Sequence, residues 1–402
     1  MIKISIQSVI HYYFLAAILF TTSAPTSANW SVTWLPATRA VDLNDSGQVT
    51  GTEGGFFDDP FMAYLTGLNG LGFTDLGTLG GIDATALAIN NSGQIAGKSS
   101  TASEQFHAYI TGANGIGMVD LDLAGEDFSN RTIEAMNSSG QLTGAIQDDI
   151  NELERAYITG SNGRNMTPME TLGGNSSSAS DINDSGQVVG KSDTSSGNFH
   201  AFITSSNGSV MKDLGTLGGN TSRAEAINNL GQVVGEAQVA RGTSHAFVTS
   251  PSGDAMMDLG TLGGQSSFAR DINDAGEVIG SASTATGENH AFLYSHGGIT
   301  DLNQIFNATV GSDEQLDADD VFSVSAINDN QQILGSVFYL GEKDFNMTFL
   351  LSYTSDTVFT PNPIYIPPIP EPRAYFMLIA GVGLISFVVT RKRKAAQQTV
   401  AS

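Results

Sequence analysis

The sequence contains no cysteine, which excludes disulfides and thiolate metal sites as the means of holding the fold together. Charged residues are scarce at 14% of 402, and basic ones are the scarcer kind, with 17 Lys and Arg against 41 Asp and Glu. Several of the basic residues lie near the two ends, so the region between the ends is more acidic still. Such a surface repels phosphate backbones, and we predict no binding to nucleic acid.

Recognisable catalytic motifs are also lacking. The chain has no Gly-x-Ser-x-Gly nucleophile elbow, and no phosphate-binding glycine loop follows an expected strand. Glycine, by contrast, is abundant at 46 residues, and together with Ser, Thr and Asn it is typical of short strands joined by tight turns. We therefore predict an all-β protein that is not an enzyme.

The N-terminus has the pattern of a secretory signal peptide. Lys3 precedes an apolar run from Val9 to Phe20, and small residues lead to an expected cleavage site after Ala28. We expect residues 1–28 to engage the secretion translocon and to be removed by signal peptidase.

The C-terminus has three elements in order. A Pro-rich linker over 356–372 ends in the motif Pro370, Glu371 and Pro372. The apolar segment 374–390, within an anchor and tail over 373–402, is just long enough to span a bilayer once. A basic stop signal predicts that its far end is cytoplasmic, and it consists of Arg391, Lys392, Arg393 and Lys394.

This tail resembles the PEP-CTERM sorting signal, which has the same three elements. The resemblance implies a transient anchor in the inner membrane and processing near Pro370–Pro372 by an exosortase. Display at the cell surface, or release into the extracellular space, would follow. An ordinary single-span anchor is the alternative.

Between the ends, one core motif recurs seven times: an apolar residue, Asn, two turn residues, Gly-Gln, two small or apolar residues, and Gly. The asparagines are separated by 45 to 47 residues, and by 55 before the last copy. Asn opens a turn and Gly supplies positive φ, so these positions predict hairpin turns. The six regular pairs are Asn44 and Gly47, Asn90 and Gly93, Asn137 and Gly140, Asn183 and Gly186, Asn228 and Gly231, and Asn273 and Gly276.

Two further motifs accompany each core. Asp-Leu-Gly-Thr-Leu-Gly-Gly is complete at 75–81, 213–219 and 258–264, and His-Ala-aromatic begins at His107, His200, His245 and His290. This pattern is similar to the HAF repeat family of predicted extracellular proteins. The resemblance implies location and repetition more than a defined activity.

Repeats of about 46 residues with four short strands have the size of propeller blades. We predict a seven-bladed β-propeller over 29–355, in which Trp30–Leu35 supplies the strand that the last repeat lacks. An open β-repeat array is the alternative, because repeats alone do not require closure.

Two sets of repeated residues suggest metals at first sight. Asp42, Asp181 and Asp271 precede the turns as the first ligand of a calcium loop would, but other repeats have alanine there and none has the closing glutamate. We interpret these loops as structural turns, with calcium as the less favoured reading. The histidines recur once per repeat, so we interpret them as structural and predict no metal or other cofactor.

Three acidic stretches interrupt the repeats, at 122–130, 147–154 and 311–320. The last one is our candidate ligand loop, because long loops on one face of a propeller often carry function; a solvated surface loop is the plainer reading. Its acidic residues are Asp313, Glu314, Asp317, Asp319 and Asp320.

These observations predict an exported surface or extracellular-matrix protein that binds exopolysaccharide or mediates surface contacts in a biofilm. The alternatives are a propeller-fold polysaccharide lyase or glycosidase and, third, a calcium-dependent adhesin.

Overall fold

The computed structural model describes residues 30–353, apart from residues 38, 55–59, 123–129, 149–152, 312–313, 318–319 and 340–344. The predicted signal peptide, linker, sorting motif, membrane segment and basic stop signal lie outside these residues. Within the described part of the chain, no helix is long and apolar enough to cross a membrane.

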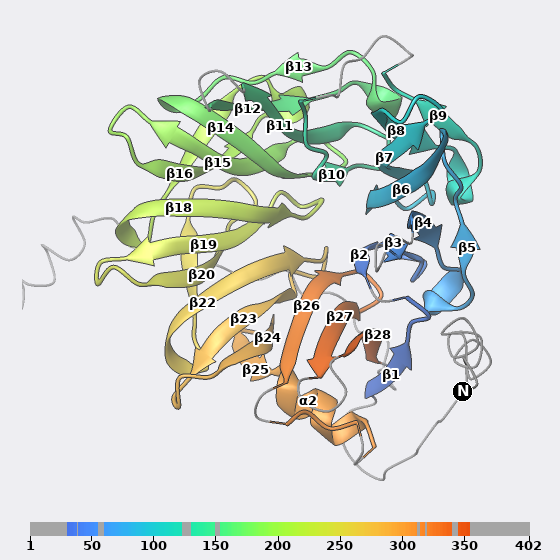
Figure 1. The fold of residues 1–402 in the computed structure, drawn as a ribbon. Coiled ribbons are helices and arrows are strands. Elements are labelled where there is room, and N and C mark those ends of the chain that lie inside the picture. Colours follow the sequence, from blue (N-terminus) through green and yellow to red (C-terminus); the bar gives the residue numbers. More distant parts are fainter. Residues whose placement is uncertain are drawn as a thin grey trace, which may run out of the picture. The chain divides into compact units, whose positions relative to one another are not determined.

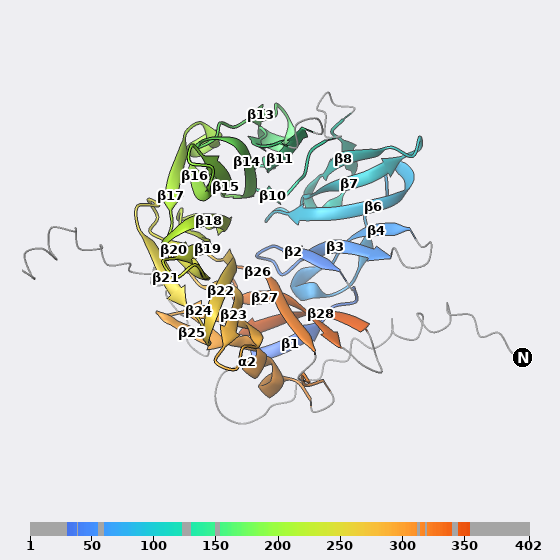
Figure 2. The same cartoon turned by 60° about the vertical axis from the view of Figure 1, so that its left-hand side comes forward.

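Seven four-stranded antiparallel sheets surround a central channel, which confirms the predicted seven-bladed propeller over the open array (Figures 1 and 2). Blade 1 contains β2 (Ala40–Leu43), β3 (Val49–Gly54), β4 (Phe61–Leu65) and β5 (Thr74–Asp75). Blade 2 contains β6 (Gly80–Ile89), β7 (Ile95–Thr101), β8 (Phe106–Thr111) and β9 (Met118–Asp120). Blade 3 contains β10 (Ala135–Met136), β11 (Leu142–Asp148), β12 (Leu153–Ile158) and β13 (Thr167–Pro168).

The next three blades have the same order. Blade 4 contains β14 (Gly173–Ile182), β15 (Val188–Thr194), β16 (Phe199–Thr204) and β17 (Met211–Gly215). Blade 5 contains β18 (Gly218–Ile227), β19 (Val233–Val239), β20 (Ser244–Thr249) and β21 (Met256–Gly260). Blade 6 contains β22 (Gly263–Ile272), β23 (Val278–Thr284), β24 (Asn289–Ser295) and β25 (Gly298–Asp301).

Blade 7 joins the two ends of the described chain. It contains β26 (Val321–Ile327), β27 (Gln332–Tyr339), β28 (Phe345–Tyr353) and the N-terminal strand β1 (Trp30–Trp34). β1 pairs antiparallel with β28, with Trp30 opposite Tyr353 and Trp34 opposite Phe349. The strand predicted to complete the last repeat therefore does so, and the ring is closed by backbone hydrogen bonds.

The repeated motifs form the strands expected of them. In blade 4, the stretch before Asn183 is the inner strand β14, and the segment after Gly-Gln is β15. Within each blade the aromatic residue of the third strand is fully buried, which explains why His-Ala is always followed by a ring. These residues are Tyr64, Tyr109, Tyr157, Phe202, Phe247, Phe292 and Phe349.

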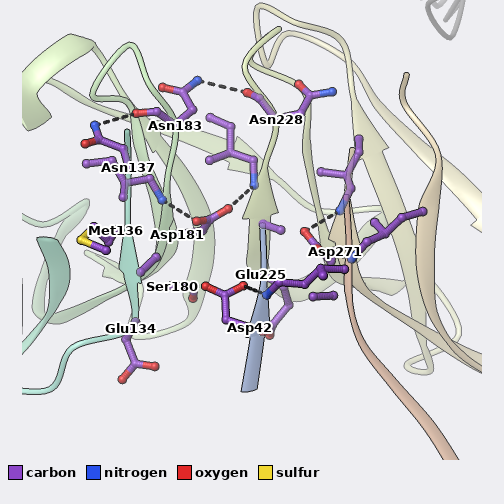
Figure 3. Close-up of a pocket in the computed structure, with 18 of the residues that line it drawn as sticks. Asp42, Glu134, Met136, Asn137, Ser180, Asp181, Asn183, Glu225, Asn228 and Asp271 are labelled. Carbon is purple, nitrogen blue, oxygen red and sulfur yellow. Dashed lines mark hydrogen bonds between the residues drawn. The ribbon is translucent and has the colours of Figure 1, made fainter. Parts of the chain in front are cut away.

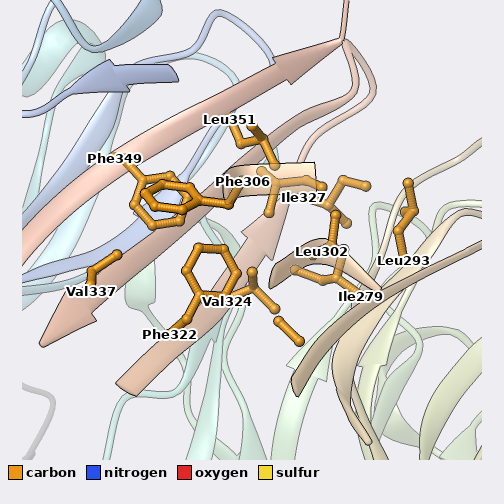
Figure 4. Packing of buried hydrophobic residues seen from close by; sticks show 12 residues of the cluster. Ile279, Leu293, Leu302, Phe306, Phe322, Val324, Ile327, Val337, Phe349 and Leu351 are labelled. Atoms are coloured by element: carbon orange, nitrogen blue, oxygen red, sulfur yellow. The ribbon is translucent and has the colours of Figure 1, made fainter. Parts of the chain in front are cut away.

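Blade 7 has the most aromatic core. The ring of Phe349 stacks on Phe322 (Figure 4), with centroids 5.2 Å apart. The ring of Trp34 meets Phe349 edge-on at 6.0 Å. Phe306, fully buried in the same cluster, comes from helix α2 (Leu302–Thr309), which the sequence analysis did not predict. Asp301 caps this helix by accepting hydrogen bonds from the backbone N–H groups of the second and third residues after it.

Four 3-10 turns, each built on a three-residue segment ending in Asn-Gly, complete the connections between third and fourth strands. They are η1 (Leu68–Gly70), η2 (Ala113–Gly115), η3 (Ser161–Gly163) and η4 (Ser206–Gly208).

Candidate functional site: the acidic central channel

The inner strands β2, β6, β10, β14, β18, β22 and β26 form the wall of the central channel. In six of these strands the pairing with the second strand shifts register two to four residues before the repeat asparagine, as between Ala179 and Asp181 in β14. A β-bulge bends the strand and redirects neighbouring side chains. It thereby allows two consecutive residues, such as Ser180 and Asp181, to line the channel.

The seven repeat asparagines form a closed circle of hydrogen bonds, which we call the Asn ring. In each blade the side-chain amide donates to the backbone carbonyl of the asparagine in the next blade. Asn183 donates to Asn228 at 3.1 Å (Figure 3), and Asn328 completes the circle by donating to Asn44 at 3.0 Å. The other five bonds measure 3.0 to 3.2 Å and link Asn44 to Asn90, Asn90 to Asn137, Asn137 to Asn183, Asn228 to Asn273, and Asn273 to Asn328.

Each asparagine also organises its own turn. The side-chain oxygen Oδ1 of Asn44 accepts hydrogen bonds from the backbone N–H groups of Ser46 and Gln48, and its side-chain amide donates to the Gln48 side chain. The turn glycines have positive φ, as the motif predicts, from +71° at Gly47 to +79° at Gly231. The six are Gly47, Gly93, Gly140, Gly186, Gly231 and Gly276. In the seventh repeat Gln331 takes the same conformation, at +58°.

The residue after each asparagine lies at the mouth of the channel. At six of the junctions between blades, the backbone N–H of this residue donates a hydrogen bond to a side-chain oxygen of the equivalent residue in the next blade. For example, Asn229 donates to Asp274 at 2.8 Å. Burial, together with the charges of Asp274 and Asp45, raises the pKa of Asp329 to about 6. We call Asp45, Asp184, Asp274 and Asp329 the mouth carboxylates.

Three further carboxyl groups lie deeper in the channel, two residues before the asparagine in blades 1, 4 and 6. We call Asp42, Asp181 and Asp271 the channel carboxylates (Figure 3). One oxygen of each accepts the N–H of the following residue, and the other accepts the N–H of an isoleucine in the next blade, at 2.7 to 2.8 Å. Each of them therefore bridges two blades.

The channel carboxylates are held in an environment that favours their protonated form. Burial raises the pKa of Asp42 to about 6, against the opposing effect of its two backbone donors. Burial, aided by the charge of Asp42, raises the pKa of Asp181 to about 7. The pKa of Asp271 is raised well above its ordinary value by burial and by the charges of both other carboxylates. The three groups thus interact across one space.

Farther from the Asn ring the lining is mixed. Glu225 approaches Arg270 at 3.9 Å and also contacts the Arg223 side chain, which lies 3.6 Å from Glu236 on the second strand. Burial raises the pKa of Glu225, and the two arginines oppose that rise. Both arginines are thus close to glutamates, Lys191 is a further cation of the lining, and the four mouth carboxylates make the mouth the acidic end.

The channel encloses about 550 Å³, which is within the range of small-molecule sites. Its lining is rich in Asn, Asp, Ser and small aliphatic residues, and no described aromatic side chain lines it. Recognition in this space would therefore depend on charge and hydrogen bonds more than on ring stacking.

The other predicted site residues lie elsewhere. Glu314, Asp317 and Asp320 of the candidate ligand loop do not line the channel, and the backbone carbonyl of Glu314 accepts a hydrogen bond from Tyr339. Asp313 and Asp319 lie outside the described residues, as do Pro370, Glu371, Pro372 and the basic stop signal Arg391–Lys394. The repeat histidines are on third strands, and each is paired with an aspartate of the fourth strand of its blade.

The channel carboxylates are the functional candidates that the sequence analysis passed over. From the sequence, these aspartates are interpreted as parts of structural turns, with calcium ligation as the less favoured reading. In the structure, both oxygens of each accept hydrogen bonds from backbone N–H groups. A signal was present in the sequence. The same position holds aspartate in three repeats and alanine in the other four, at Ala88, Ala135, Ala226 and Ala326.

Comparison with known proteins supports the fold alone. No family model matches the chain, and no curated protein matches it. Among solved structures, the β-propeller domain of the Trilobed protease from Pyrococcus furiosus matches 85% of this chain and 100% of its own, with 11% identity and a TM-score of 0.52. TolB from Acinetobacter baumannii matches 76% of this chain, which spans 64% of TolB, with 11% identity and a TM-score of 0.43.

These matches correct one prediction. The similar propeller of Pyrococcus furiosus is a domain of a protease. Our prediction that the chain is not an enzyme rested on a propeller without recognisable catalytic motifs. That prediction is wrong, because the same fold occurs as a domain of a protease. The likeness transfers no activity to this chain.

Proposed function

We propose that this chain is an exported propeller that binds an amine-bearing exopolysaccharide at the acidic mouth of its central channel. The observation that carries the proposal is the gathering of the four mouth carboxylates, Asp45, Asp184, Asp274 and Asp329, around one channel. These four carboxylates provide hydrogen-bond acceptors at one end of a space of about 550 Å³. Protonated amines form strong, charge-assisted hydrogen bonds with such acceptors.

Other ligand classes fit this space less well. An anionic polysaccharide or a phosphate would meet like charge at the mouth. A bare metal ion needs ligand atoms close together. Of the described residues, the one group with three such atoms within 4.8 Å lies outside the channel. A ligand with several separate ammonium groups, such as a polymer of glucosamine with free amino groups, fits carboxylates that are acidic but are held on different blades.

The test compares two oligosaccharides that differ only in charge. The full chain should bind a glucosamine tetramer in calorimetry and should bind the fully N-acetylated tetramer at least tenfold more weakly. Affinity should fall as salt rises, because much of the attraction is between charges near solvent. Equal binding of the two oligomers, or binding of neither, would contradict the proposal.

Variants locate the binding. We expect the double substitution Asp274→Asn and Asp329→Asn, at the mouth, to weaken binding of the glucosamine tetramer at least tenfold. The matched control is Glu314→Gln with Asp317→Asn, which removes the same charge from the predicted ligand loop outside the channel. If the control weakens binding as much as the mouth variant, the ligand binds at the loop or responds only to overall charge.

A second candidate function is cleavage of a polysaccharide in the same channel. The observation that favours it is the pKa of Asp181, raised to about 7 by burial and by Asp42, since a carboxyl group that keeps its proton near neutral pH can act as a general acid. This candidate predicts new reducing or unsaturated ends when the chain is incubated with exopolysaccharide, and their loss in Asp181→Ala. Retention of the polymer without product would count against it.

The two terminal signals support the cellular location that we propose: export, transient anchoring in the inner membrane, and exosortase processing before surface display or release. The basis is the order of Pro370–Pro372, an apolar segment and a basic cluster. Mass spectrometry of the chain recovered from the cell surface should find peptides that start near residue 29 and none beyond the motif. An intact tail at the surface, or a purely cytosolic protein, would contradict this location.

A further inference from the structure

The histidine of each His-Ala-aromatic motif is paired with the aspartate of the following Asp-Leu motif. In blade 4 the Nδ1 atom of His200 lies 2.9 Å from Asp213, and in blade 5 that of His245 lies 2.8 Å from Asp258. The pair recurs in blades 2 and 6. This pair links the third strand of a blade to the fourth. Because it recurs in four blades, we interpret it as a structural element of the repeat.

Blade 2 departs from this pattern by one charged residue. Asp122, two positions after Asp120, accepts the backbone N–H of Ala108 at 2.9 Å. Neutral oxygen atoms accept the equivalent N–H in other blades, and they belong to Ser177, Ser222, Ser267 and Asn303. A neutral acceptor is thus sufficient for the fold, and the second carboxylate beside the His–Asp pair is specific to blade 2.

The result is a compact group of three metal-ligating side chains. One ligand atom from each of His107, Asp120 and Asp122 lies within 4.8 Å of the others, and all three residues are half-buried. The side chains of His107 and Asp120 are 19% and 11% exposed and lie 2.8 Å apart. A cation placed between the two carboxylates would be attracted by the charges of both.

We propose that His107, Asp120 and Asp122 form a metal site for a divalent transition ion, with Zn²⁺ as the ion that fits best. One imidazole and two carboxylates form a three-residue ligand set, to which a tetrahedral ion adds one water or external ligand. The nitrogen ligand favours Zn²⁺ over Ca²⁺ or Mg²⁺, which prefer oxygen alone. The N–H of Ala108 holds one oxygen of Asp122 and orients that ligand.

This site is separate from the proposed polysaccharide site. It belongs to the outer strands β8 and β9 of blade 2 and the residues that follow, and none of its three residues lines the channel. Binding of Zn²⁺ can therefore succeed or fail independently of binding in the channel.

The chain contains its own control for the test. Calorimetry of the untagged full chain, after removal of metals with a chelator, should show one Zn²⁺ bound per chain. Asp122→Asn should weaken this binding at least tenfold, and blade 6 shows with Asn303 that an amide is compatible with the fold at that position. Asp213→Asn alters the corresponding pair of blade 4, which has Gly215 in place of a second carboxylate, and should leave the affinity unchanged.

A spectroscopic readout separates ligation from structural effects. Co²⁺ added to the metal-free chain should give visible absorption bands of a site with low coordination number, and both His107→Gln and Asp122→Asn should abolish them. The proposal is overturned by any of three results: no saturable binding of Zn²⁺ to the unaltered chain, equal binding to Asp122→Asn, or an equal loss in Asp213→Asn.

Discussion

The side-chain amide of Asn328 donates a hydrogen bond to the backbone carbonyl of Asn44, 284 positions earlier in the chain, at 3.0 Å. This bond joins the last blade to the first and completes the Asn ring. The propeller is therefore closed in two places. The Asn328–Asn44 bond closes it near the central axis, and the pairing of β1 with β28 closes it within blade 7. Closure also removes an exposed sheet edge, which would otherwise be free to pair with other chains.

Replacing Asn328 by alanine should destabilise the protein by about 2–4 kcal/mol, because it leaves buried partners without hydrogen bonds. The side chain is 3% exposed, and it bonds its own turn as well as Asn44. Urea unfolding measures the effect. The control is Asn220→Ala on the surface, which we expect to change stability by less than about 0.5 kcal/mol. If the two variants lost the same free energy of unfolding, the Asn ring would contribute little to stability.

Closure of blade 7 depends on Trp34. Its ring meets Phe306 and Phe349 edge-on, at 5.9 and 6.0 Å, and so connects β1 to α2 and β28. Trp34→Ala should reduce the free energy of unfolding by about 3 kcal/mol. Trp30→Ala, at the start of the same strand, loses the ring contact with Tyr353, the single ring contact of Trp30 among the described residues, and should cost less. The account fails here if the two substitutions shift the urea midpoint equally.

The final glycine of each repeat is required by a close backbone approach. A Cβ atom at Gly190 would lie 2.0 Å from the carbonyl oxygen of Ser178 on the inner strand, whereas one at Gly197 would meet nothing within 4 Å. Gly190→Ala should therefore cost about 3 kcal/mol or more. Gly197→Ala should cost about 1–2 kcal/mol, from its positive φ alone. Thermal unfolding would distinguish the two variants. An equal loss of stability would contradict the close approach of the Ser178 carbonyl to Gly190.

Stability should fall as pH rises from about 4 to about 7. The pKa of Asp181 is about 7 in the folded state against 3.8 ordinarily, and that of Asp42 is about 6. The folded state binds these protons more tightly than the unfolded state does. The stabilisation is therefore complete below the ordinary pKa and is lost as the pH passes through the raised values.

The variant Asp181→Ala tests this pH dependence, since alanine occupies the same position in the next blade, at Ala226. Its free energy of unfolding should decline less steeply between pH 4 and 7 than that of the unaltered chain. Parallel pH profiles for the two proteins would mean that the channel carboxylates titrate normally.

The repeat asparagines show how much of this structure the sequence can predict. Their spacing and neighbouring glycines predict the turns, the four strands per repeat and the count of seven blades, because all of these depend on local patterns. The bonds from Asn44 to Asn90 and from Asn328 to Asn44 were not predictable, because a partner in the next blade is defined only once the ring has closed.

The site was predicted less well than the fold, for a related reason. Asp42, Asp181 and Asp271 are 90 or more residues apart in sequence and share no local motif beyond the turn. They meet because three inner strands face one axis, and a bulge in each strand directs the side chain inward. Helix α2 was missed because its eight residues have no counterpart in the other repeats.

The most direct test of the central claim is the structure of the full chain in complex with a glucosamine tetramer. We predict that the sugar lies at the mouth of the central channel, with ammonium groups within hydrogen-bond distance of the mouth carboxylates. A tetramer bound instead on the outer strands or at Glu314 and Asp317, with an empty channel, would contradict the account.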